Sequence, residues 1–448
     1  MNAVNARQWI TRDLLDRNIL QGIILRFIAT LAALLWLGAS PAARDWPQFR
    51  GPAGRGVSDE TGLPLTWSAT SGVAWKTALP GPGHSSPIVW GDRILLTAFK
   101  SSEGALGRMT SALTSRLAMG HRPTGQLFVL CLDRATGRIV WQREVAPPAI
   151  EEVHNTNSPA TPTPVTDGSL VYVYFGSRGL FAYDFNGKLV WEKPLGPFPN
   201  EWGSGSSPVL YDDLLLLNID SDGDDVLLAV DKRSGKTVWQ APRTNAQRAW
   251  PTPAVWRKPD GDEIVVSGSA RVIGYDAKTG AERWRVNGLS SWVSPTPFVA
   301  HGLLYVASGG SGGNVVLAIR PGGRGDVTAT HVAWRTERVA PYISSPVIAG
   351  DLLFTVRDGG IVACLDAKNG RLIWQQRLAA AGSYYASPLA ADGKIYVTNE
   401  DGVVTVLAAK PSFRVLTTND IGERTLASPA VSDRTIFLRS DEHLWAIR

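Results

Sequence analysis

Residues 220–225 carry a dense set of possible metal ligands, in the order Asp-Ser-Asp-Gly-Asp-Asp. Carboxylates at alternate positions around a glycine are typical of calcium-binding loops, because they place several oxygens around one cation. That pattern also requires a bidentate glutamate further along, and none follows at the required spacing. Asp220, Asp222 and Asp224 are therefore weak candidates for a calcium site, and a polar hairpin tip is the alternative.

Other catalytic patterns fail on their context. The segment Gly309–Gly313 matches G-x-S-x-G, but it lies in an expected hairpin loop rather than between a strand and a helix. The six histidines show no metal-ligand spacing, and two cysteines are too few for a disulfide framework or a thiolate zinc site. These patterns therefore name no catalytic residues, and they favour a protein without enzyme activity over an enzyme.

Aromatic and polar residues instead recur in the segments between expected strands. The candidates for ligand binding are His84, His154, Asn157, Trp202, Trp250, Trp292, Tyr342, Tyr385, Arg178, Arg357, Arg424 and Arg439. Aromatic rings offer stacking surfaces, and guanidinium groups can hold a polycarboxylate. Because acidic residues are interleaved with these arginines, a solvated rim of mixed charge is the alternative to an anion site.

Two repeated phrases define the elements that carry these residues. The first phrase consists of a small residue, an Asp two positions later, a Gly, and a Trp four positions after the Gly. In its first copy these are Cys131, Asp133, Gly137 and Trp141. The second is Ser or Thr before a proline and an apolar run, with the prolines Pro87, Pro164, Pro208, Pro253, Pro297, Pro346, Pro388 and Pro429. Each interval holds four short runs of strand-forming residues bounded by turn formers. Eight such units predict an all-β, eight-bladed β-propeller with four-stranded antiparallel blades.

The ends of the repeat region predict how the ring closes. The last unit stops at Arg448, where the other units have their turn Asp, so it lacks a fourth strand. The segment Gly72–Lys76 has the fourth-strand pattern and precedes the first unit. We therefore expect this N-terminal strand to complete the last blade. Residues 72–448 would then form one monomeric propeller, preceded by an extended arm at 44–71.

Seven tryptophans occupy the same fourth-strand position. They are Trp75, Trp141, Trp191, Trp239, Trp284, Trp334 and Trp374. A buried aromatic ring covers about 150–250 Å². Repetition at one structural position predicts a packing role between blades, and a ladder that stacks ligands is the alternative.

These phrases resemble the pyrroloquinoline-quinone-repeat (PQQ-like) β-propeller family, whose motif is A-x-D-x-x-T-G-x-x-x-W. The motif fits the five copies that end at Trp141, Trp191, Trp239, Trp284 and Trp374, with one deletion in the second of them. The resemblance covers residues 72–448, and the segment Asp45–Pro52 looks like the arm of many exported members. It implies the fold but no single activity, since the family includes quinone-dependent dehydrogenases and an outer-membrane assembly scaffold. PQQ and calcium are candidate cofactors by this resemblance alone.

In a propeller, the loops between blades and the loops between second and third strands open on one side, here called the top face. The candidate ligand-binding residues belong to these loops, so we expect a top-face funnel for a protein or a small ligand. A plug of the central channel is the alternative. The leading interpretation is a non-catalytic scaffold, and the alternatives are a PQQ-dependent dehydrogenase and an outer membrane protein assembly scaffold.

The first blade carries an insert at about residues 100–125. Leu106, Met109, Leu113 and Leu117 lie on one face of an expected helix. A helix over residues 104–121 could cap the funnel or dock a protein partner, and packing on the propeller's own top face is the other interpretation.

Residues 1–43 combine scattered arginines, an apolar core and small residues up to Ala43, which is typical of a secretory signal peptide. An uncleaved anchor is the alternative. No cysteine lies near the cleavage site for lipid attachment, so we expect a periplasmic or otherwise exported protein without a membrane span in the mature chain. A formal charge of +5 without a basic run argues against a nucleic-acid partner.

Overall fold

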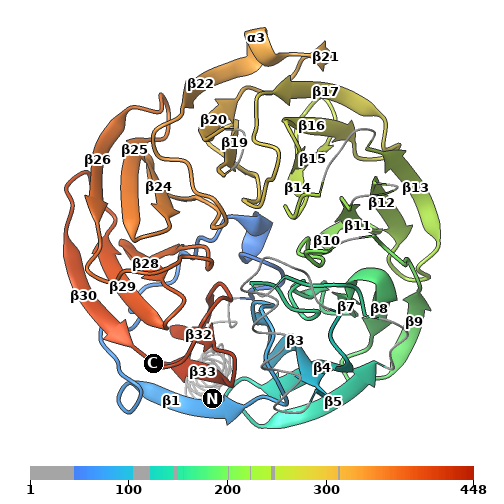
Figure 1. The fold of residues 1–448 in the computed structure, drawn as a ribbon, viewed down its shortest axis with the longest axis vertical. Coiled ribbons are helices and arrows are strands. Elements are labelled where there is room, and N and C mark those ends of the chain that lie inside the picture. Colours follow the sequence, from blue (N-terminus) through green and yellow to red (C-terminus); the bar gives the residue numbers. More distant parts are fainter. Residues whose placement is uncertain are drawn as a thin grey trace, which may run out of the picture. The chain divides into compact units, whose positions relative to one another are not determined.

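The computed structural model describes residues 45–103, 122–145, 150–154, 156–199, 201–221, 223, 225–243, 248–310 and 313–448. Residues 1–43, residues 104–121, Asp222 and Asp224 lie outside this described part of the chain. Eight β-sheets follow one another in sequence order around a central channel, which confirms the predicted eight-bladed propeller (Figure 1). None of the described helices is long and apolar enough to cross a bilayer.

Each blade contains four antiparallel strands, and blades are numbered here along the chain. Blades 1 to 4 comprise β2 Ile88–Trp90, β3 Arg93–Ser101, β4 Gly125–Asp133 and β5 Ile139–Val145; β6 Val165–Thr166, β7 Val171–Tyr174, β8 Leu180–Tyr183 and β9 Leu189–Lys193; β10 Val209–Tyr211, β11 Leu214–Ile219, β12 Val226–Asp231 and β13 Thr237–Pro242; and β14 Ala254–Trp256, β15 Glu263–Gly268, β16 Arg271–Asp276 and β17 Glu282–Asn287. Blades 5 to 8 comprise β18 Phe298–Ala300, β19 Leu303–Ser308, β20 Val315–Ile319 and β22 Val332–Thr336; β23 Val347–Ala349, β24 Leu352–Arg357, β25 Ile361–Asp366 and β26 Leu372–Arg377; β27 Leu389–Ala391, β28 Lys394–Thr398, β29 Val403–Ala408 and β30 Val415–Asp420; and β31 Ala430–Ser432, β32 Thr435–Arg439, β33 His443–Ile447 and β1 Val73–Ala78. The first strand of each blade lines the channel, and the fourth strand lies on the outer rim (Figure 1).

Strand β1 closes the ring as the sequence predicts. It pairs antiparallel with β33, and Trp75 lies opposite Ala446 in the register. The chain therefore begins and ends its repeat region in one blade, and β1 covers the outer edge of β33 (Figure 1).

The repeated Asp-x-x-Thr-Gly phrase forms the turn between third and fourth strands. In blade 1, the Asp133 carboxylate accepts hydrogen bonds from the amide and hydroxyl of Thr136, and Gly137 takes a φ of 72°. The hydroxyl bond from Thr136 is the main reason why the pKa of Asp133 lies below its usual range. Glycine is required here because this φ lies in the left-handed region.

The repeated tryptophan packs against the same turn of the following blade. The Trp75 indole N–H donates a hydrogen bond to the Arg134 carbonyl, and the Trp141 indole N–H donates one to the Phe185 carbonyl. Trp191, Trp334 and Trp374 make equivalent bonds to the carbonyls of Lys232, Ala367 and Lys410. Each of these bonds ties two neighbouring blades together.

The junction between blades 4 and 5 departs from this pattern. Trp284 donates instead to the buried Glu263 carboxylate of its own blade. The chain between β20 and β22 adds a fifth strand, β21 Gly325–Asp326, which runs parallel to β17, and then forms the short helix α3 Thr328–His331. Blade 4 is thus extended outwards by a segment of blade 5 (Figure 1).

The arm that precedes β1 crosses the side of the propeller opposite the top face. Trp46 forms a bridge with Val89 of blade 1, and the short 3-10 helix η1 Pro52–Gly54 lies at the centre of the ring (Figure 1). The arm then pairs with Ala390 of blade 7 through backbone hydrogen bonds. The Glu60 carboxylate accepts hydrogen bonds from the backbone amides of Asp433 and Arg434, in a hairpin of blade 8. These contacts attach the arm to blades 7, 8 and 1, which are neighbours where the ring closes.

Candidate functional site

The central channel contains a cavity of about 430 Å³, called here the cup. Its described lining consists of Phe49, His84, Ser86, His154, Thr156, Asn157, Thr161, Thr163, Trp202, Gly205, Ser207, Trp250, Thr252, Ser294, Thr296, Tyr342, Ile343, Ser345, Asp358, Tyr385, Ser387, Leu426 and Ser428. Hydroxyl-bearing and aromatic residues dominate this set, and Asp358 is its single carboxylate. The volume is within the range of about 300–1,000 Å³ that is typical of small-molecule sites.

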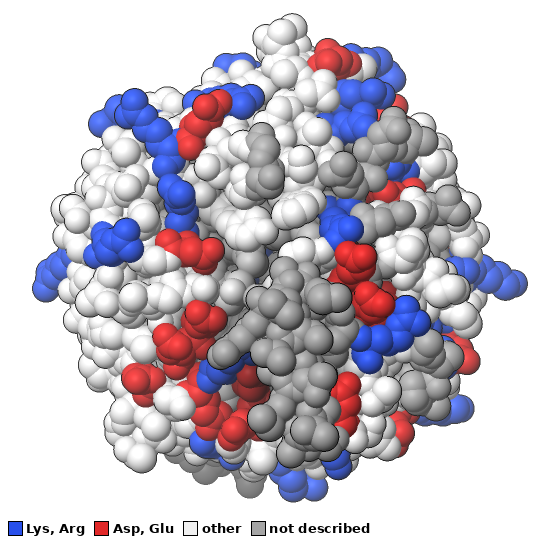
Figure 2. Space-filling view, in the orientation of Figure 1, with Lys and Arg blue, Asp and Glu red and all other residues white. Residues whose placement is uncertain are grey.

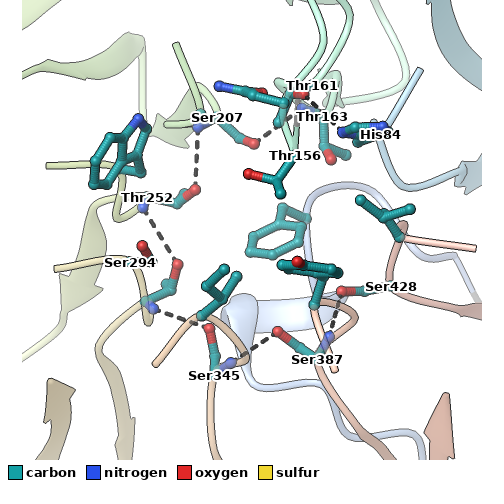
Figure 3. A pocket seen from close by; sticks show the side chains of 18 of the residues that line it. His84, Thr156, Thr161, Thr163, Ser207, Thr252, Ser294, Ser345, Ser387 and Ser428 are labelled. Carbon is teal, nitrogen blue, oxygen red and sulfur yellow. Dashed lines mark hydrogen bonds between the residues drawn. The ribbon is translucent and has the colours of Figure 1, made fainter. Parts of the chain in front are cut away.

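A series of hydroxyls runs around the cup, one from each blade. Each residue stands directly before the first-strand proline: Ser86, Thr163, Ser207, Thr252, Thr296, Ser345, Ser387 and Ser428. The backbone N–H of each member from Ser86 to Ser387 donates to the hydroxyl oxygen of the next blade, over 2.9 to 3.3 Å (Figure 3). The Ser86 hydroxyl has no hydrogen-bond partner among the described residues, so the series ends where blade 8 meets blade 1.

The arm forms the floor of the cup. Phe49 lines the cavity, and the next residue, Arg50, donates to the Pro346 carbonyl, one residue beyond the ring hydroxyl of Ser345. Pro47 accepts the amide of Thr166, again on the far side of the ring from the top face. Residues of the arm therefore close the channel from below, and the cup lies between the arm and the loops of the top face.

One wall of the cup is an aromatic cluster from blades 2 to 5. His154 stacks on Trp202 with ring centroids 4.2 Å apart, and Trp250 and Trp292 pack against Trp202 at 6.4 and 5.9 Å. Asn157 donates to the Trp202 carbonyl, which fixes the loop that carries this ring. Loss of water around His154 lowers its pKa, so the imidazole on this wall is neutral near pH 7.

The neighbouring wall, in front of blade 1, contains His84 beside two arginines. Loss of water lowers the pKa of His84 to about 3, and the positive charges of Arg424 and Arg439 add to this effect. Arg439 is buried and donates to the carbonyl and hydroxyl of Ser85, whereas Arg424 pairs with Asp441. His84 is therefore a neutral hydrogen-bonding group in the cup.

The structure brings seven of the twelve predicted ligand-binding residues to one cavity. His84, His154, Asn157, Trp202, Trp250, Tyr342 and Tyr385 line the cup. Trp292 lies behind Trp202, and none of the four predicted arginines belongs to the described lining. Arg178 pairs with Glu192, and Arg357 donates to the Arg338 carbonyl. The arginines thus do not form a ring around the cavity.

Charged groups of both signs cover the face shown in Figure 2. On the top face, the Glu423 carboxylate lies 2.7 Å from the Lys76 ammonium and 3.0 Å from the His443 imidazole. Glu423, Glu442 and His443 have ligand atoms within 4.8 Å of one another, which is close enough for a metal ion. The Lys76 ammonium already neutralises Glu423, so this cluster is satisfied as an ion-pair network.

The predicted calcium residue Asp220 is buried away from the cup lining. Both of its carboxylate oxygens accept hydrogen bonds from the Arg243 guanidinium, and Asn218 donates to one of them. Burial raises the pKa of the neighbouring Asp225 to about 7, and the charge of Asp220 contributes to this rise. Asp220 is thus engaged in a buried ion pair, while Asp222 and Asp224 lie outside the described residues.

Two parts of the site were missed by the sequence analysis. The serine or threonine before each proline was recognised only as a strand marker, although its recurrence in eight units was the signal of a hydroxyl ring. Phe49 was assigned to the arm without a role, because no local pattern indicates that a segment crosses a channel.

Cys131 and Cys364 are buried free thiols in separate blades, and burial raises the pKa of each to about 12.

The fold and its repeats define a PQQ-like eight-bladed β-propeller. The chain belongs to the family described as outer membrane protein assembly factor BamB, whose family model matches residues 128–255 and 224–448. A solved BamB from Moraxella catarrhalis covers 84% of this chain and 96% of its own, at 18% identity and a TM-score of 0.58.

Quinone-dependent enzymes share the same fold. A polyvinylalcohol dehydrogenase from Pseudomonas sp is 24% identical over 419 residues, covering 80% of this chain and 55% of that protein. A europium-containing methanol dehydrogenase covers 91% of both chains at 11% identity and a TM-score of 0.63. The chain spans about half the length of the curated relatives that it matches.

The described cup does not fit the cofactors that the resemblance implies. PQQ is a polycarboxylate, and calcium takes six to eight oxygen ligands, commonly from several carboxylates. Among the described lining residues, Asp358 is the only carboxylate, and no lysine or arginine contacts the cavity. We therefore derive no chemical step through PQQ or calcium.

Proposed function

We propose that the protein is a non-catalytic binding scaffold that takes its ligand in the cup on its top face. The observation that supports this most is the shape and chemistry of the cup. It is closed below by Phe49, and it is lined by hydroxyls and half-buried aromatic rings from the top-face loops. Acid–base catalysis commonly relies on two groups that exchange protons near the working pH. Asp358 has no carboxylate partner in the described lining. The pKa values of both cup histidines, His84 and His154, are lowered.

Export from the cytoplasm is part of this proposal. The leader at residues 1–43 supports it, and the family description refers to the outer membrane. The mature chain would then consist of the arm at 44–71 and the propeller at 72–448, acting as a periplasmic or otherwise exported monomer.

A cup-filling substitution tests whether the cup is the binding site. Ser294 is half-buried and lines the cup, so Ser294→Trp places an indole in the cavity. Native mass spectrometry of the protein purified from its host should show a bound mass in the wild type and none in Ser294→Trp. Thr237→Trp on the exposed outer strand β13 is the control and should keep the bound mass. Equal occupancy in all three proteins would refute the proposal.

A dehydrogenase is the second candidate, and the likeness to quinone-dependent enzymes favours it. Titration with PQQ and calcium, followed by tryptophan fluorescence and dye-coupled alcohol oxidation, separates the two functions. The scaffold proposal expects no turnover. Turnover that is lost in Ser294→Trp would show that the cup is an active site.

A protein partner in outer-membrane assembly is the third candidate, favoured by the family description. Residues 104–121 are the proposed docking segment. Deletion of this segment should abolish capture of a purified assembly partner and leave the bound mass in the cup unchanged. Unchanged capture would exclude the segment as the docking site.

A further inference from the structure

The charge of the cup lining restricts which ligands can be bound. Asp358 is the single carboxylate in the described lining. Its carboxylate accepts a hydrogen bond of 3.0 Å from the Tyr384 backbone amide. His84 and His154 both have lowered pKa values and are neutral near pH 7. No described lysine or arginine lines the cavity. A carboxylate or phosphate entering the cup would lose its water without meeting a cation, which is costly.

The hydroxyl ring supplies many neutral hydrogen-bonding groups at one level. A hydroxyl has one donor and two acceptor positions. Each ring hydroxyl from Thr163 to Ser428 accepts one backbone amide and so keeps its hydrogen for another partner. The remaining hydroxyl, that of Ser86, has no partner among the described residues. Because one residue comes from each blade, these groups surround the channel axis (Figure 3).

Aromatic rings complete the cup above and below this ring of hydroxyls. Phe49 closes the floor, and Trp250 and Tyr385 are half-buried at the cavity wall. Such rings offer apolar faces within a polar site. A pyranose sugar has the matching form, with hydroxyls around its edge and C–H groups on its faces.

We propose that the cup binds an uncharged polyhydroxylated ligand, such as the end of a neutral oligosaccharide. The inference rests on the proposed function and specifies its ligand class. A sugar lying across the channel would exchange hydrogen bonds with the ring hydroxyls and stack on Phe49. The single carboxylate argues for binding without cleavage, because glycoside hydrolysis commonly uses two carboxyl groups about 5–9.5 Å apart.

Two buried arginines near the channel make an acidic sugar the main competitor. Arg50, below the floor, and Arg439, behind His84, are buried and have guanidinium nitrogens without hydrogen-bond partners in the described chain. Their charge favours electron-rich oxygens in the channel. Neither residue lines the cup, however, so neither is placed to pair directly with a ligand carboxylate.

Isothermal calorimetry with defined sugars tests the ligand class. The purified protein is titrated with maltotetraose, cellotetraose and chitotetraose, and in parallel with tetragalacturonate and PQQ. We expect heat of binding with a neutral tetrasaccharide and none with the two anions. Binding of tetragalacturonate or PQQ in place of the neutral sugars would overturn the inference but leave the cup as the binding site.

A pair of serine variants tests where the sugar binds. Ser294→Ala removes the hydroxyl of a half-buried residue that lines the cup, so it should weaken sugar binding by about 2- to 10-fold. Ser206→Ala removes a buried hydroxyl that does not line the cup, and should leave affinity unchanged. Phe49→Ala should weaken binding through loss of stacking. Equal affinities in all variants, or no binding by the whole panel at millimolar concentration, would reject the inference. If the bound mass is also insensitive to Ser294→Trp, the proposed function fails as well.

Discussion

Each ring hydroxyl belongs to a residue that precedes a proline, and this position shapes its environment. Proline disfavours the helical conformation in the residue before it and holds that residue extended. The extended residue then directs its N–H sideways, and Thr163 and Ser207 illustrate how that N–H reaches the hydroxyl of the next blade. The Ser/Thr-Pro pair thus starts the inner strand and links neighbouring blades at the same time.

The tryptophan bonds between blades can be tested by one matched pair. Trp141 and Trp239 are equally buried, but only Trp141 donates its indole N–H, whereas the Trp239 nitrogen has no partner among the described residues. Trp141→Phe should therefore reduce the free energy of unfolding by about 1 kcal/mol more than Trp239→Phe, because it also removes a hydrogen bond. Urea unfolding measures both values. Equal losses would show that the indole bond contributes nothing to blade docking.

His84 should make stability depend on pH. Its pKa is about 3 in the folded protein and about 6.5 when unfolded, so between these values only the unfolded chain binds the proton. Its stabilising contribution is complete above about pH 6.5 and decreases as the pH falls towards 3. Urea midpoints should therefore fall less in His84→Gln than in the wild type between about pH 7 and pH 4. His301→Gln, at an exposed position, should keep the wild-type slope, and a wild-type slope in His84→Gln would contradict the assignment.

At the scale of elements, β1 and the arm hold the ring closed on two levels. Strand β1 completes blade 8 at the rim, while the arm contacts blades 1, 7 and 8 beneath the channel. The pattern of Gly72–Lys76 predicted the first of these roles, because a fourth-strand phrase was present without a blade. The second role depends on contacts between residues far apart in the chain, such as Arg50 with Pro346, 296 positions away, which no local pattern encodes.

A proline in β1 should open the ring. Leu79 donates its amide to Glu442, and Thr77, two residues earlier and opposite Leu444, faces β33 in the same way. Thr77→Pro should therefore lower the free energy of unfolding by about 3 kcal/mol or more. Ala69→Pro in the turn Ser68–Ser71 should change stability little, since proline suits the second position of a turn. Equal stability of the two variants in urea would mean that β1 does not close the ring.

At the scale of the whole molecule, eight repeats place eight similar loops around one axis, and differences between repeats create the site. The blade count and ring closure followed from the repeated phrases in the sequence. The extra strand β21 did not, because nothing in the sequence between Ala318 and Trp334 indicates that this connection pairs with blade 4. The positions of His84, Trp202 and Tyr385 in top-face loops led us to expect them in one cavity. The described lining holds no arginine, because side chains such as Arg424 form ion pairs with nearby acidic residues, which the sequence does not reveal.

The most direct test of the account is a crystal structure of the protein in complex with its ligand, beginning with a neutral tetrasaccharide. We predict ligand density inside the cup, with ligand oxygens within hydrogen-bond distance of the hydroxyls of residues such as Ser294 and Thr252, and a ligand face against Phe49. Ligand density on the outer rim or on the face covered by the arm, with the cup holding only water, would contradict the central claim.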